Sequence, residues 1–247
     1  LNLSLKILKL KTFIFSLSLF VSAYCYGQES PNFLWLVCED QSLFFSMYGD
    51  SSANTSNINQ LAKDGMVYQN CYTTSPVCAP SRSSLITGMY PTTLGTQHMR
   101  AYKKSAVNNT INTHNSLPYY SAKPMKPIRF FTEDLRANGY YCTNNSKEDY
   151  NMITSPLAWD ESSQTAHWRN RKEGQPFFSV FNFNVTHESR VWKNKAPYSK
   201  EELENVLIPY LFPEDNGIRG DLLTNYKNIE KLDAQIGVII DQLKADG

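Results

Sequence analysis

The sequence contains little cysteine, and what it has is too sparse for a disulfide framework. Five of the 247 residues are cysteine, and Cys25 lies in an N-terminal segment that we expect to be removed. The other positions, Cys38, Cys71, Cys78 and Cys142, are far apart for a chain of this length. The mature chain is long enough to bury a hydrophobic core instead, as one large domain or two small ones.

The sequence also lacks an excess of charge of either sign. It has 24 basic and 23 acidic residues, which gives a formal net charge of +1. Nucleic-acid-binding proteins typically carry a basic patch or tail, and the sequence shows neither. We therefore expect no nucleic-acid partner.

Long hydrophobic runs are scarce, and the clearest one lies at the N-terminus. The basic segment Lys6–Lys11 precedes the apolar stretch Thr12–Cys25. This stretch is short for a membrane span, and no second apolar segment follows to stop transfer. We expect residues 1–27 to be a cleaved signal peptide and the mature protein to be periplasmic or secreted, without stable membrane insertion. Tyr24 fits poorly before a lipoprotein cysteine, so lipidation is the lesser alternative.

Continuous apolar runs indicate strands that are buried on both faces of a parallel sheet. Two such runs are Asn32–Cys38 and Phe177–Asn184, and two weaker ones are Met66–Tyr72 and Tyr140–Thr143. Helical spacing of apolar residues predicts helices at Asn57–Lys63, Phe131–Asn138 and Asp221–Asp246. The fold class that follows is α/β, with a mixed, largely parallel sheet flanked by helices. Polar residues follow three of the strands, and ligands bind at this edge of such sheets.

The segment from Cys78 to Gly88 is the most informative part of the chain. It reads Cys-Ala-Pro-Ser-Arg, then Ser-Ser-Leu-Ile-Thr-Gly. The first five positions would match a chosen pattern of this kind in about one chain in a thousand at average residue usage. A buried thiol in a turn before a helix is the alternative interpretation.

This segment resembles the C-x-P-S-R…T-G signature of type I sulfatases, which belong to the alkaline-phosphatase-like superfamily. In that family the cysteine is oxidised to formylglycine, whose hydrate is the nucleophile. The resemblance implies that Cys78 is the nucleophile precursor and that Arg82 orients the hydrated aldehyde. It also implies a maturation partner, either a formylglycine-generating enzyme or an anaerobic sulfatase-maturating enzyme.

The resemblance implies further site residues. Glu39 and Asp40 match the acidic pair that, with the matured residue 78, binds one divalent cation, usually Ca²⁺, although the usual pair is Asp-Asp. Lys147 matches a sulfate-binding lysine, but Ser146 replaces the preceding glycine and the histidine expected two positions later is missing. His187 matches the histidine near the leaving oxygen.

Substrate recognition is less well defined. His98 and Arg100 are candidate substrate-binding residues, and the segment around them is similar to heparan N-sulfatase-like members. The family commonly acts on sulfated sugars or polysaccharides, so we expect a sulfated carbohydrate substrate and a hydrolase acting on sulfuric esters.

The resemblance runs from Pro31 to Gly247, and Leu232–Gly237 is similar to the family's Leu-Asp-x-x-x-Gly segment. The family's second metal-binding pair would follow. We therefore expect residues 28–247 to be the N-terminal part of a sulfatase catalytic domain, inactive by itself. Two alternatives remain open: a phosphonate monoester or phosphodiester hydrolase of the same superfamily, and an inactive fragment or sulfated-glycan binding protein.

Overall fold

The computed structural model describes residues 30–99, 122, 123, 125, 127–195 and 197–247. The chain divides into two units, residues 1–32 and 33–247, and every described helix and strand belongs to the second unit. The expected signal peptide, residues 1–27, lies outside the described residues. Among the described helices, none combines the length and the apolar character that a membrane crossing requires.

The described elements of the second unit include both strands and helices. In chain order they are β1 (Phe33–Cys38), η1 (Ser46–Tyr48), α2 (Ser56–Asp64), α3 (Cys78–Thr87), α4 (Pro91–Leu94), α5 (Phe131–Ala137), β2 (Tyr141–Asn145), β3 (Glu161–Ser162), η2 (Trp168–Asn170), β4 (Phe177–Phe183), α6 (Ser189–Lys193), α7 (Lys200–Glu204) and α8 (Asn216–Asp246).

The described strands form one parallel sheet in the order β1-β4-β2-β3. Cys38 at the end of β1 pairs with Phe183 at the end of β4, and Asn145 at the end of β2 lies opposite Phe181. Because all pairs are parallel, these ends share one edge of the sheet. The predicted α/β fold class is confirmed, and the described sheet is entirely parallel.

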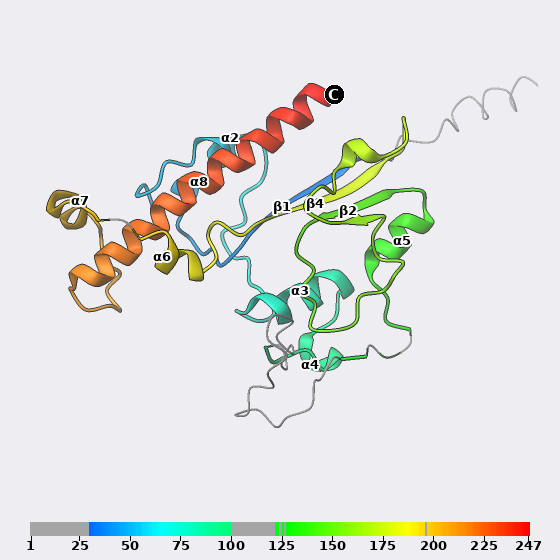
Figure 1. Cartoon of the computed structure of the whole chain (residues 1–247), viewed down its shortest axis with the longest axis horizontal. Coiled ribbons are helices and arrows are strands. Elements are labelled where there is room, and N and C mark those ends of the chain that lie inside the picture. Colours follow the sequence, from blue (N-terminus) through cyan, green and yellow to red (C-terminus); the bar gives the residue numbers. More distant parts are fainter. Residues whose placement is uncertain (1–29, 100–121, 124, 126, 196) are drawn as a thin grey trace, which may run out of the picture. The chain divides into compact units, whose positions relative to one another are not determined.

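Helix α8 packs on one face of the sheet (Figure 1). Ile229, Leu232 and Ile236 lie three and four residues apart, so they share one side of the helix. They are at most 2 % exposed and belong to the same buried cluster as Phe177 and Phe181 of β4. Burial of this apolar stripe is the main reason that the helix forms against the sheet.

Helices α3, α4 and α5 lie on the other side of the sheet from α8 (Figure 1). Phe131 of α5 packs edge-on against Phe178 of β4, with ring centroids 5.2 Å apart. Ile86 of α3 and Leu94 of α4 form a second buried cluster with residues of the segment after β2. Gly88 ends α3 with φ 69°, a left-handed conformation that glycine adopts without steric cost.

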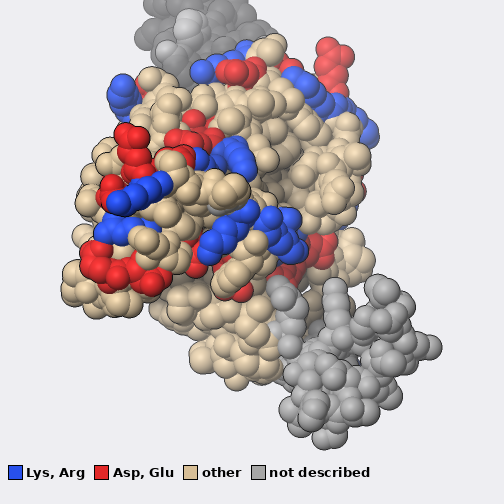
Figure 2. Space-filling model, turned by 60° about the vertical axis from the view of Figure 1, so that its left-hand side comes forward, with Lys and Arg blue, Asp and Glu red and all other residues tan. Residues whose placement is uncertain are grey.

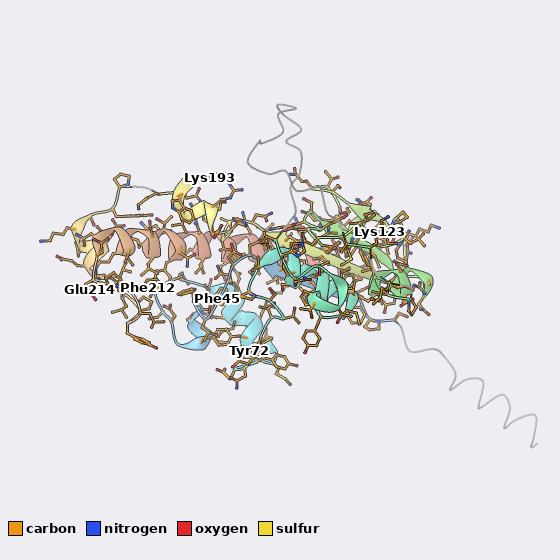
Figure 3. All side chains as sticks on the ribbon, turned by 90° about the horizontal axis from the view of Figure 1, so that it is seen from below. Phe45, Tyr72, Lys123, Lys193, Phe212 and Glu214 are labelled. Carbon is orange, nitrogen blue, oxygen red and sulfur yellow. The ribbon has the colours of Figure 1, made fainter. Side chains whose placement is uncertain are left out.

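The strand predicted at Met66–Tyr72 does not form. Tyr72 is 86 % exposed and stands at the periphery in Figure 3, and Met66 is 77 % exposed. An apolar run becomes a strand only when a neighbouring strand pairs with it, and none of the described strands does so here. The other predicted strands and helices are confirmed within a few residues, with α8 beginning earlier, where Asp215 caps its first turn.

Candidate active site

The candidate site lies where β1 and β4 end. The chain leaves β1 through Glu39 and Asp40, and it leaves β4 through Asn184 to His187. The two exits are held together because the N–H of Glu39 donates to the carbonyl of Phe183 at 3.2 Å and the hydroxyl of Thr186 donates to the carbonyl of Glu39 at 2.7 Å. The acidic pair and His187 therefore emerge at the same edge, as the parallel topology requires.

Helix α3 presents Cys78 and Arg82 to this edge. Cys78 is the first residue of the helix and is half-buried, and Arg82 lies one turn further along. Residues four apart share one face of a helix, so a chemical group at position 78 and the Arg82 guanidinium lie on the same side. Arg82 is only 7 % exposed, which shows that its guanidinium is turned into the protein.

Arg82, Glu39 and Lys147 form what we call the charged cluster. One carboxylate oxygen of Glu39 accepts from Arg82 and the other accepts from the ammonium group of Lys147. Glu39 is 4 % exposed, and the Lys147 side chain, in the segment after β2, is 17 % exposed. A buried charge is stable only when it is paired, and each member of the cluster provides that pairing.

Asn182 of β4 forms hydrogen bonds to the charged cluster and to β2. Its side-chain oxygen accepts from Arg82 at 2.6 Å, and its amide nitrogen donates to the Asn144 side chain at 2.8 Å and to the Asn145 carbonyl at 3.1 Å. This residue was not predicted from the sequence. The available signal was the sequence of the strand, Phe-Phe-Ser-Val-Phe-Asn-Phe, in which Ser179 and Asn182 are polar residues among apolar ones.

The surroundings of Glu39 fix its charge. Burial alone would raise the pKa of its carboxyl, but the charges of Arg82 and Lys147 and their hydrogen bonds outweigh burial and hold the pKa below its ordinary value. Glu39 therefore stays ionised and neutralises one of the two cations. The three side chains of the cluster carry one positive charge in excess, which the Asp149 carboxylate, 3.9 Å from the Lys147 ammonium, offsets in part.

Asp40 is hydrogen-bonded to the residue that follows His187. Asp40 has a left-handed backbone with φ 48°, and its carboxylate accepts from the N–H of Glu188 at 2.8 Å. The N–H of Ser189 donates to Nδ1 of His187 at 3.2 Å, so in the neutral ring the proton resides on Nε2. A proton at Nε2 is available to an external acceptor.

The residues that follow Lys147 differ in burial and in their contacts. Tyr150 is 6 % exposed and packs edge-on against Phe130, so it is part of the core, and its burial raises the pKa of its hydroxyl. Asp149 lies 3.9 Å from the Lys147 ammonium. The Asn151 side chain donates to the carbonyl of His98, which brings exposed His98 beside this segment. Arg100 lies outside the described residues.

The described residues do not form a calcium site as they are arranged. Ca²⁺ takes about six to eight oxygen ligands. Both oxygens of Glu39 are held by Arg82 and Lys147, and one oxygen of Asp40 accepts from Glu188. Across the described ranges, no group of three His, Cys, Asp or Glu side chains could hold a metal ion. The cation stays a prediction for the whole protein.

The arrangement defines a class: a parallel α/β sheet with a helix that presents a cysteine and an arginine to the edge where the strands end. The sulfatase family model matches residues 31–247, and the chain belongs to the sulfatase family. A curated relative, an ulvan-active sulfatase of Formosa agariphila, is 39 % identical over 89 % of this chain and 41 % of its own length. The chain thus spans less than half of that relative.

Solved structures share the fold at low sequence identity. A putative sulfatase of Bacteroides fragilis has a TM-score of 0.61 at 16 % identity, over 88 % of this chain and 59 % of its own. A phosphonate monoester hydrolase of Agrobacterium radiobacter has a TM-score of 0.57 at 13 % identity, over 88 % and 60 %. A protein solved with its substrate, D-glucosamine-2-N,6-O-disulfate, has a TM-score of 0.55 at 14 % identity, over 88 % and 63 %. The chain therefore shares its fold with the putative sulfatase and with the phosphonate monoester hydrolase.

Proposed function

We propose that the whole protein is a polysaccharide sulfatase, and that Cys78 is the precursor of its nucleophile. The single observation that carries this proposal is the charged cluster beside α3. It brings together buried Arg82, one helical turn from Cys78, and half-buried Lys147, with the Glu39 carboxylate between them and the Asp149 carboxylate 3.9 Å from Lys147. Membership of the sulfatase family and the similarity to an ulvan-active relative support a sulfated polysaccharide as the substrate.

The residues of this chain have separable roles in that reaction. A hydrated formylglycine at position 78 would supply two hydroxyl groups on one carbon, one to attack sulfur and one to expel sulfate afterwards. Arg82 would orient the hydrated aldehyde, and Lys147 would bind an oxygen atom of the sulfate through a charge-assisted hydrogen bond. His187 holds a proton at Nε2 for the oxygen of the departing alcohol, which is a poor leaving group without it.

The metal ion, export and the maturation of Cys78 are proposals for the whole protein. The complete site needs metal ligands beyond those that the described residues offer. The roles given to Arg82, Lys147 and His187 do not depend on a metal ion. We further propose that the protein is exported and that a sulfatase-maturating enzyme oxidises Cys78. The likeness of residues 97–100 to N-sulfatases also stays a prediction.

The test uses the full-length protein co-expressed with a formylglycine-generating enzyme. Peptide mass analysis should show loss of sulfur at Cys78, and the protein should release sulfate from ulvan oligosaccharides. The Cys78→Ala variant should lose this activity by about 1,000-fold or more, since the nucleophile is absent. Cys71→Ala is the matched control, because Cys71 is an exposed cysteine away from the cluster. Turnover by Cys78→Ala at the wild-type rate would contradict the proposed role of Cys78.

A second candidate function is phosphonate monoester or phosphodiester hydrolysis. The fold similarity to the phosphonate monoester hydrolase favours it, because the same edge of the sheet could bind either tetrahedral anion. Parallel assays with an aryl sulfate and an aryl phosphonate monoester distinguish the two. A higher kcat/KM for the phosphonate would replace the sulfatase proposal.

A further inference from the structure

A cavity of about 600 Å³ lies on the α8 face of the sheet, where β2 and β4 end. It is lined by the ends of β2 and β4, by α6 and by one side of α8, and Figure 1 shows these helices next to each other. Its volume falls within the range of about 300–1,000 Å³ that is typical of small-molecule sites. Asn145 and Phe181 lie opposite each other in the sheet and both contribute to its wall.

Polar groups without partners line this cavity. The half-buried guanidinium of Arg190 has no hydrogen bond or ion pair to any described residue, and the same holds for the side-chain amides of Asn184 and Gln235. A half-buried guanidinium without a protein acceptor is open to water or to an anionic ligand. No acidic residue belongs to the described lining of the cavity.

The lining also includes an apolar part. Val185 and Val238 belong to it, and Val238 is 56 % exposed. Amide and guanidinium groups can bind hydroxyl and carboxylate oxygens, while aliphatic side chains can cover the C–H face of a ring. This combination is suited to a sugar with a negative charge rather than to a purely apolar ligand.

The cavity is connected to the candidate active site by the chain that leaves β4. Asn184 and Val185 line the cavity, and His187 follows them at the edge where β1 and β4 end. The N–H of Arg190 donates to the carbonyl of His187 at 2.8 Å, so these two residues share one turn of the chain. A ligand that occupies the cavity lies next to the edge at which sulfate would bind.

We propose that this cavity is a subsite for an acidic sugar next to the sulfated sugar of the same polysaccharide chain. Arg190 binds the carboxylate or second sulfate of that sugar, and Asn184 and Gln235 bind its hydroxyl groups. The subsite deepens the proposed function and rests on it for the identity of the ligand. It makes Arg190 a residue that determines substrate specificity.

The experiment measures binding, so that it does not depend on turnover. Full-length protein carrying Cys78→Ala is titrated with ulvan oligosaccharides by isothermal titration calorimetry, with and without Arg190→Ala. We expect Arg190→Ala to raise Kd about 10-fold or more, since a charge-assisted hydrogen bond is lost. Arg190→Lys, which keeps the charge, should recover part of the affinity.

Lys193→Ala is the matched control. Lys193 lies on the same helix and its removal changes the net charge equally, but it is exposed, does not line the cavity and is labelled at the outer side of α6 in Figure 3. Its Kd should stay within about twofold of the parent protein, as for a rim charge without contacts. Equal weakening by Lys193→Ala and Arg190→Ala would overturn the subsite in favour of a general charge effect.

The remaining outcomes separate the subsite from the proposed function. Unchanged Kd in Arg190→Ala overturns the subsite even if the matured protein releases sulfate. Absence of binding by the parent protein also overturns it. Arg190-dependent binding without any sulfate release from the matured protein supports the subsite and contradicts the sulfatase proposal.

Discussion

At the scale of single residues, Glu39 combines two properties that rarely occur together. It is 4 % exposed and it remains ionised, because Arg82 and Lys147 hold both of its oxygens. Loss of its charge would leave two cations close together with no anion between them. The sequence identified all three residues, but assigned Glu39 to a metal ion, Arg82 to the hydrated aldehyde and Lys147 to the sulfate. Strand and motif positions carry no information on which side chains pair with one another.

We therefore predict that Glu39→Gln destabilises the protein by about 3 kcal/mol, the cost of removing one partner from a buried ion pair. Urea unfolding followed by circular dichroism measures this change. Glu188→Gln is the control, since Glu188 is an exposed carboxylate in the same region and should change stability by about 0.5 kcal/mol or less. Equal effects of the two substitutions would show that the charged cluster does not stabilise the fold.

The same pair of proteins gives a pH dependence. The pKa of Glu39 is lowered from its ordinary value of 4.5, so its contribution to stability is complete above that pH and is lost as the pH falls through the lower, folded-state value. The stability difference between wild type and Glu39→Gln should therefore narrow on acidification below about pH 4.5. A difference that is constant from pH 7 to about pH 3 would contradict this prediction.

The cysteines give a second prediction at this scale. Burial raises the pKa of Cys38 and of Cys142 to about 12, whereas Cys71 is exposed. Only a thiolate reacts readily with an alkylating agent. Iodoacetamide at neutral pH should label Cys71 in the native protein, and Cys38 and Cys142 only after unfolding in urea. Peptide mapping by mass spectrometry measures the labelling; comparable native labelling of Cys142 and Cys71 would show that the sheet opens.

At the scale of elements, the segment Leu232–Gly237 explains how α8 is attached to α2. Leu232 is completely buried in the core on the sheet. The carboxylate of Asp233 accepts from the backbone N–H groups of Asn57 at 3.1 Å and of Ile58 at 2.8 Å, which lie in the first turn of α2. A Cβ at Gly237 would lie 2.7 Å from the Asn57 side chain, so only glycine allows this close approach.

Asp233 thus caps α2 from another helix, because Thr55 provides no side-chain hydrogen bond at the N-cap. We predict that Asp233→Ala destabilises the protein by about 2 kcal/mol, since it leaves N–H groups of α2 without an acceptor. Asp241→Ala is the control, because Asp241 is exposed on the same helix, and it should cost about 0.5 kcal/mol or less. Equal losses in chemical denaturation would contradict the capping role.

The elements also show where sequence patterns reach their limit. The runs that became β1, β2 and β4 could be predicted because continuous apolar residues suit strands with two buried faces. Met66–Tyr72 has a similar composition but no pairing partner among the described strands, and a pattern within one segment contains no information about partners. The cavity beside α6 could not be predicted either, since it depends on how β4 and α8 are spaced.

At the scale of the whole molecule, the sheet has an open side. Strand β1 lies at one end of the order β1-β4-β2-β3, so its outer N–H and C=O groups have no neighbouring strand in the described residues. Phe33 and Trp35 of this strand are 40 % and 38 % exposed. In the view of Figure 2, acidic and basic side chains are interspersed, in keeping with the net charge of +1. An exposed, apolar strand edge is a site of self-association.

We predict that the polypeptide of residues 1–247, expressed by itself, binds other copies of itself and releases no sulfate. The first effect follows from the open edge at β1, and the second from the shortage of metal ligands among the described residues. Size-exclusion chromatography and a sulfate-release assay measure the two. The control is a longer polypeptide that includes these residues and has the full length of the relatives. Expressed with the same maturating enzyme, it should be monomeric and active. Metal-dependent sulfate release from residues 1–247 would show that a complete site forms without ligands from elsewhere.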